Sequence, residues 1–145
     1  RLGWLWAPEP IAAPALNLHG QSVTSAASFT MAAGVAALNG PQDCIREMVA
    51  AYADRRRFMI DALASIDGVE CDAPDGAFYL FPRFPKTGLD SVGIADALLE
   101  RADIAAVPGI AFGRPGDRSV RFTIATAMAD LEKAAERLAK VAPTL

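Results

Sequence analysis

The most regular alternation of apolar and polar positions lies in residues 119–125. Every second residue there is apolar, namely Val120, Phe122 and Ile124. This alternation is typical of a β-strand with one buried face. A short apolar run at 104–107, followed by a Pro-Gly loop, predicts a second strand.

Arg121 stands among the apolar positions of that alternating segment. Because successive side chains of a strand point to opposite faces, Arg121 should point away from the packed layer. A guanidinium held on a strand is a well-oriented, two-pronged receptor for a carboxylate. The residues alone leave two interpretations open: a carboxylate-binding arginine, or an edge-strand arginine in water or in a salt bridge.

Residues 69–81 read as two short strands, 69–72 and 77–81, joined by a turn in which Pro74 presets the backbone and Gly76 supplies a positive φ. A helix follows, capped by Asp90 or Ser91 and reaching about residue 102, and Thr126 can cap a final helix. From residue 69 onward the predicted order is strand, strand, helix, strand, strand, helix. This order predicts an α/β fold with helices packed on a small sheet.

The first 67 residues show less regular patterns. Residues 2–7 are apolar and rich in tryptophan, which suits a buried strand, and residues 11–18 could begin a helix that Pro14 interrupts. A hydroxyl-rich segment at 21–28 leads into a helix that ends near residue 40. A long helix is then predicted over residues 41–66, with Gly68 stopping it. Its apolar stripe consists of Ile45, Met48, Val49, Tyr52, Met59, Ile60, Leu63 and Ile66.

Composition narrows the possible functions. The chain has 145 residues, and its hydrophobic content of 52% is ample for a buried core. Its 14 basic and 17 acidic residues are mixed along the chain, which gives no patch for nucleic acid or for an anionic membrane. Cys44 and Cys71 lack metal-binding spacing and are expected to be buried free thiols in a reducing compartment. With no apolar run of membrane-spanning length and no signal peptide, we expect a soluble cytoplasmic protein.

Several short motifs occur in a fixed order along the chain, each weak by itself. They are Arg1-Leu2-Gly3-Trp4, Asn39-Gly40-Pro41-Gln42-Asp43, Pro74-Asp75-Gly76-Ala77-Phe78-Tyr79, Val107-Pro108-Gly109, Phe112-Gly113, Val120-Arg121-Phe122, Asp130-Leu131 and Arg137-Leu138. The ordered set resembles the C-terminal part of class I/II aminotransferases, and looks nearest to the bacterial aspartate and aromatic types. The resemblance implies a fold type I enzyme that uses pyridoxal 5'-phosphate to move an amino group from an amino acid to a 2-oxo acid.

The resemblance also implies a domain arrangement. Residues 1–40 would be the C-terminal end of the large cofactor-binding domain, 41–67 a long interdomain helix, and 68–145 the small α/β domain. The enzyme would be a cytoplasmic homodimer with no nucleic acid or membrane partner. Because the chain opens on Arg1 inside an apolar run, we expect it to be the C-terminal part of a longer polypeptide.

The site residues follow from the matching motifs. Arg121 matches the arginine that binds the substrate α-carboxylate, and Arg1 matches an arginine that contacts the cofactor phosphate. Gly76 and Phe78 match a turn close to the substrate. The segment from Gln21 to Ser25 aligns with one that reaches the neighbouring subunit's site in related dimers.

Two departures from the family pattern limit these expectations. The catalytic Schiff-base lysine has no counterpart, because Lys86, Lys133 and Lys140 are the only lysines and none lies where the family places it. By itself the chain is therefore expected to be inactive and to bind the cofactor poorly or not at all. Ala26-Ala27 stands where relatives often carry Asn-Pro, and no arginine lies near Gln21. This weakens any expectation of strict specificity for a dicarboxylic amino acid.

Two alternatives remain open at this point. Another fold type I enzyme, such as a lyase, decarboxylase or synthase, would share the scaffold. A non-catalytic α/β ligand-binding module would also fit the order of elements, and it predicts no exposed apolar surface around residues 2–6.

Overall fold

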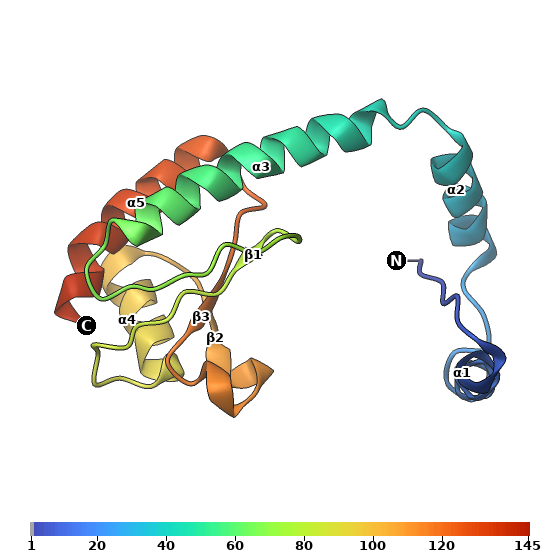
Figure 1. Ribbon diagram of the computed structural model, residues 1–145, viewed down its shortest axis with the longest axis horizontal. Helices are drawn as coiled ribbons and strands as arrows, with labels where there is room; N and C mark the ends of the chain where they lie inside the picture. Colours follow the sequence, from blue (N-terminus) through green and yellow to red (C-terminus); the bar gives the residue numbers. More distant parts are fainter. Residues whose placement is uncertain (1) are drawn as a thin grey trace. The chain divides into compact units, whose positions relative to one another are not determined.

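The computed structural model describes residues 2–145, and Arg1 lies outside the described residues. The contacts within the chain divide it into two compact units, Arg1–Ile45 and Arg46–Leu145. Figure 1 shows the helices and strands of both units, coloured along the sequence.

The first unit contains the helices α1 (Glu9–Ser22) and α2 (Ser28–Asn39), and neither buries a side chain. The strand predicted at residues 2–7 is wrong, because this segment has no regular structure. A strand needs a neighbouring strand for its backbone hydrogen bonds, and the described part of this unit contains none. The interruption predicted at Pro14 is also wrong, since α1 continues through that residue.

The long helix predicted over residues 41–66 is confirmed as α3 (Asp43–Ala64). Gly68, with a φ of 82°, lies four residues beyond its end in the left-handed conformation that glycine adopts at little cost. Only Met59 and Leu63 of α3 are buried, so the predicted apolar stripe contributes to the core at its C-terminal end alone. Met48 and Val49, nearer its N-terminal end, are 52% and 62% exposed.

A three-stranded antiparallel sheet organises the second unit, with β3 (Val120–Thr123) between β1 (Tyr79–Leu80) and β2 (Val107–Pro108). β1 and β3 are shorter than the pattern predicted, and β2 overlaps the strand predicted at 104–107 only at Val107. The strand predicted at 69–72 is reduced to one bridge, in which Glu70 pairs with Arg83. Hydrogen-bonded pairing across a small sheet lasts only a few residues, whereas apolar alternation continues into the segments that lead to the strands.

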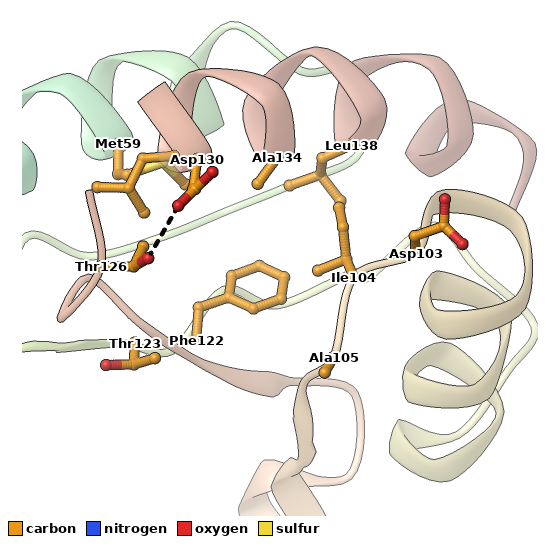
Figure 2. A pocket seen from close by; sticks show the side chains of 11 residues that line it. Met59, Asp103, Ile104, Ala105, Phe122, Thr123, Thr126, Asp130, Ala134 and Leu138 are labelled. Atoms are coloured by element: carbon orange, nitrogen blue, oxygen red, sulfur yellow. Dashed lines mark hydrogen bonds between the residues drawn. The ribbon is translucent and has the colours of Figure 1, made fainter. Parts of the chain in front are cut away.

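Two helices complete this unit, α4 (Ser91–Ala102) and α5 (Met128–Val141), together with three short 3-10 helices. Asp90 caps α4 as predicted, because its carboxylate accepts the Gly93 N–H at 2.8 Å. Thr126 does not cap α5, whose N-cap residue is Ala127. The Thr126 hydroxyl lies one residue too early and is instead 3.5 Å from the Asp130 carboxylate (Figure 2).

The hydrophobic core lies entirely in the second unit. Its fully buried members come from α3, α4, α5, the sheet and the residue that follows β3, and include Leu63, Leu80, Ile94, Leu98, Val120, Ile124 and Leu138. Burial of each such side chain contributes about 1.5–3 kcal/mol. The predicted α/β class is confirmed by these helices around a small sheet.

The two cysteines differ from the expectation of buried thiols. Cys44 is exposed, because it lies in the first turn of α3, where the helix buries nothing. Cys71 is partly buried, and this burial raises the pKa of its thiol.

Candidate functional site

Arg121 lies on β3 as its alternation predicts. Its neighbours Val120 and Phe122 are 0% and 7% exposed, whereas Arg121 is only partly buried. Figure 2 shows the Phe122 ring pointing toward α5 and the next side chain, Thr123, pointing the other way. Arg121 shares the face of Thr123, because residues two apart on a strand point to the same side. The strand therefore separates the core from a second face that carries the guanidinium.

Two aromatic rings contact the Arg121 guanidinium. Its Cζ atom lies 4.3 Å from the ring centroid of Tyr79 and 4.8 Å from that of Phe112. Among the residues that the structure describes, no carboxylate forms an ion pair with Arg121, and no hydrogen bond satisfies the N–H groups of its guanidinium. A partly buried arginine without an internal counterion is able to accept an external anion.

A small cavity of about 170 Å³ adjoins this guanidinium. Its lining combines the Tyr79 ring, the backbone and small side chains of residues 105–107, Thr123 and Arg121. Arg121 is the one charged side chain among these lining residues. The arrangement can hold a small group that carries a carboxylate.

The loop that bears Phe112 is fixed to α4 by a buried serine. The Ser91 hydroxyl, which is 0% exposed, donates to the Asp117 carboxylate at 3.2 Å and accepts the Ile110 N–H at 3.1 Å. Within the loop, Gly109 and Gly116 approach so closely that a Cβ added to Gly109 would lie 2.1 Å from the Gly116 carbonyl oxygen. Only glycine fits both positions, and the loop geometry follows from this contact.

The sequence pattern singled out Arg121 but not the residues around it. Tyr79 and Phe112 entered only as members of short motifs, and Ser91 only as a possible helix cap. The register of β1 against β3 pairs Tyr79 with Thr123, and this pairing places the Tyr79 ring against Arg121. Tyr79 lies 42 residues before Arg121, and tertiary contacts of this kind leave no periodic signal in one sequence.

The turn that carries Gly76 and Phe78 lies beside α3. The Arg56 Nε donates to the Pro74 carbonyl oxygen at 2.6 Å, and the Phe78 ring stacks on Tyr52 at 5.8 Å. Phe78 also lies 4.6 Å from the Tyr79 ring, which places it one ring away from Arg121. Gly76 lines a different cavity, of about 640 Å³, together with Tyr52 and Phe78.

The predicted role of Gly76 in the turn is wrong in one respect. The positive φ, of 61°, belongs to Ala77 and not to Gly76. The turn is thus displaced by one residue from the Pro-Asp-Gly pattern. An alanine in this region carries a steric cost from its Cβ that glycine would avoid.

The remaining predicted site residues lie in the first unit. Gln21, near the end of α1, and Ser25, just after it, are exposed. Arg1, the predicted phosphate contact, is outside the described residues. A role for Gln21 and Ser25 at a neighbouring subunit stays a prediction.

The described residues do not form a site for pyridoxal phosphate. Lys86 pairs with Asp67 at 2.5 Å and Lys133 with Asp130 at 3.6 Å, while Lys140 is exposed on α5. None of these lysines lines the cavity beside Arg121. The donor set present suits a substrate carboxylate and lacks the amine that would hold the cofactor.

Comparison with known proteins decides the family. Residues 1–138 match the family described as aminotransferase class I and II. The chain is a member of this family. These aminotransferases are fold type I enzymes that depend on pyridoxal phosphate, and the membership rules out the unrelated ligand-binding module as an interpretation. Exposure of Trp4 and Trp6, at 75% and 95%, also contradicts what that alternative predicts.

About one-third of the aligned residues are identical between this chain and its named relatives. The chain is 35% identical to an aspartate aminotransferase of Pyrococcus horikoshii over 97% of its own length and 36% of the relative's. It is 34% identical to an aspartate/prephenate aminotransferase of Nitrosomonas europaea, over 97% of this chain and 38% of that one. Among solved structures, an aromatic aminotransferase from Pyrococcus horikoshii superposes with a TM-score of 0.83 and 34% identity, covering 95% of this chain and 37% of the other.

The chain thus spans little more than a third of the length of the relatives it matches. None of its described helices is long and apolar enough to cross a membrane.

Proposed function

We propose that this chain supplies the substrate-carboxylate receptor of an aminotransferase that moves an amino group from an amino acid to a 2-oxo acid. The observation that carries the proposal is Arg121, which lies on β3 beside a small cavity without an internal counterion. An α-carboxylate is common to amino acids and 2-oxo acids, so a single guanidinium can serve both halves of the reaction.

The chain's own residues would bind and orient the substrate. Arg121 would form two parallel hydrogen bonds with the carboxylate, and the walls at 105–107 would restrict its position. Pyridoxal phosphate, which Arg1 would contact and which residues outside this chain would otherwise hold, would supply the electron sink that makes the Cα proton acidic. Because no described lysine borders the site, the chain by itself is expected to be inactive.

The domain boundaries follow from the same proposal. Residues 1–40 would belong to the large domain, 41–67 to the interdomain helix and 68–145 to the small domain. The core confined to the second unit supports a separate small domain. A homodimer in the cytoplasm, with Gln21 and Ser25 near the partner's site and Gly76 and Phe78 near the substrate, completes the proposal. Arg1 would contact the cofactor phosphate.

The substrate side chain is a separate matter. The relatives are named for aspartate, for aspartate and prephenate, and for aromatic substrates. The feature these substrates share is the carboxylate that Arg121 would bind. The aromatic rings of Phe78, Tyr79 and Phe112 beside the site are compatible with an apolar substrate side chain.

Replacing Arg121 in the full-length aminotransferase tests the proposal. Truncating one partner of a hydrogen-bonded charge pair costs about 2–5 kcal/mol, so Arg121→Ala should raise KM for the amino acid about 30- to 3,000-fold. The KM of Arg121→Lys should lie between those of the unsubstituted enzyme and Arg121→Ala, because an ammonium keeps the charge but loses the two-pronged geometry. The absorbance of the bound cofactor should be unchanged in both variants.

Arg118→Ala is the matched control, since Arg118 lies three residues earlier and donates to the Pro85 carbonyl oxygen instead. It should leave KM unchanged. Equal KM values for Arg121→Ala and Arg118→Ala would refute the assignment of Arg121.

A further inference from the structure

The two rings that contact Arg121 come from separate segments of the second unit. Tyr79 belongs to β1 and Phe112 to the 3-10 helix Gly109–Phe112. Both place a ring within 5 Å of the guanidinium carbon, at 4.3 Å and 4.8 Å. A planar cation in contact with two rings is restricted in the rotations that an exposed arginine would otherwise sample.

Aromatic contacts, unlike a salt bridge, leave the charge and the N–H donors of a guanidinium available for a ligand. The attraction between a cation and a ring acts through the π face and uses none of the guanidinium N–H donors. A neighbouring carboxylate would instead occupy those donors and neutralise the charge. The absence of such a carboxylate among the described residues keeps both the charge and the donors of Arg121 available for a ligand.

Each ring is itself held in place. The Phe112 and Phe81 rings form a T-shaped pair with centroids 5.8 Å apart and planes at 83°, and the Phe112 loop is tied to α4 through Ser91. The Tyr79 backbone pairs with β3, and its ring lies 4.6 Å from the Phe78 ring. A side chain that orients another group does so only when its own rotamer is restricted by packing of this kind.

We infer that Tyr79 and Phe112 are positioning residues for the proposed reaction: the contacts of their rings with the Arg121 guanidinium hold it so that its N–H groups meet the substrate carboxylate. The inference rests on the proposed role of Arg121. It assigns no chemistry to either ring. Their contribution is to reduce the ordering that substrate binding would otherwise require of a flexible arginine.

Kinetics of ring-removing and ring-keeping variants test the inference in the full-length aminotransferase. Tyr79→Leu and Phe112→Leu should each raise KM about three- to tenfold for every amino acid tested, with kcat nearly unchanged, because the contact orients the bound carboxylate in substrate and transition state alike. Tyr79→Phe and Phe112→Tyr keep a ring over the guanidinium and should have the KM of the unsubstituted enzyme. Phe58→Leu removes a ring that packs against the core and should leave KM unchanged.

A double-substitution cycle separates the inference from the proposed function. In the Arg121→Ala background, Phe112→Leu should have no further effect on KM, because the residue it positions is gone. If Arg121→Ala raises KM but the two leucine variants match Phe58→Leu, the positioning role is wrong and the proposed function stands. If Arg121→Ala leaves KM unchanged, both fail.

A spectroscopic measurement on the 145-residue chain checks the contact without activity. Protons of a guanidinium above two aromatic rings are shielded by ring currents. The Arg121 Nε–H resonance should therefore lie upfield of the other arginines, and should move downfield in Tyr79→Leu and Phe112→Leu but not in Tyr79→Phe. An Arg121 resonance that is insensitive to both leucine substitutions would overturn the inference.

Discussion

The two units of the chain contrast in how they use apolar residues. In the second unit α5 places apolar side chains on one face and charged ones on the other, and it buries Leu131 and Leu138. In the first unit α2 is apolar or small nearly all round and buries nothing. A helix with one apolar face can form a core with its neighbours, whereas one that is apolar all round needs cover on several sides.

The contrast shows that apolar content alone does not make a core. Leu38 of α2 is 64% exposed and Leu98 of α4 is 0% exposed, although both are leucines in helices of twelve residues. This difference in exposure follows the pattern of polar residues, because helices of the second unit have one apolar face that packs on the core and a polar face toward solvent. We therefore expect the first unit to be stabilised by surface that its own residues do not supply.

The largest predicted effect is on the free energy of unfolding, and it distinguishes these two leucines. Leu98→Ala should lower the free energy of unfolding of the 145-residue chain by about 2–5 kcal/mol, because it leaves a cavity in a packed core. Leu38→Ala should change it by less than about 0.5 kcal/mol. Urea unfolding followed by circular dichroism measures both. A similar loss in the two variants would show that α2 belongs to the same cooperative core.

A smaller effect is expected from the cap of α4. Asp90→Ala removes the acceptor of the Gly93 N–H and should cost about 1 kcal/mol in the same unfolding experiment. Asp96→Ala, at an exposed position within α4, removes the same charge without removing a cap and should have almost no effect. If both variants lose the same stability, the loss comes from charge and not from capping.

The smallest effect concerns an exposed ion pair at the edge of the second unit. The hydrogen bond and then the charge of Lys86 lower the pKa of the Asp67 carboxyl below its usual 3.8. Because the pKa of Asp67 is lower in the folded chain than in the unfolded chain, the ion pair stabilises the fold fully when the pH is above the unfolded-state pKa, near pH 4. This stabilisation is lost as the pH falls through the lowered pKa of the folded chain.

Asp67→Asn and Lys86→Met should therefore lower the urea midpoint slightly at pH 6, and the difference from the unsubstituted chain should disappear at the acid end. High salt should reduce the difference at pH 6 because both side chains are exposed. A difference that grows as the pH falls would contradict the direction of the shift.

Much of the second unit was predictable from local pattern. Asp90 before an amphipathic run correctly predicted the start of α4, and the alternation around Arg121 correctly predicted which residues of β3 face the core. Both signals are local, because capping acts within one turn and side-chain direction on a strand follows from the adjacent residues.

The errors occur where neighbours in space decide the outcome. Residues 2–7 are apolar enough for a strand, but the described part of their own unit contains no strand for them to pair with. Thr126 has the chemistry of a cap but lies one residue before the N-cap position. Cys44 is exposed because the first half of α3 buries nothing.

By itself the sequence determined the α/β class, the long helix and the orientation of Arg121 away from the core, because helical and strand periodicity are properties of contiguous residues. Only the tertiary structure decided that Tyr79 and Phe112 both contact the guanidinium, and that no described carboxylate neutralises it. Those facts depend on the register of β1 against β3 and on the close approach of Gly109 to Gly116. Both are contacts between segments that only the folded chain brings together.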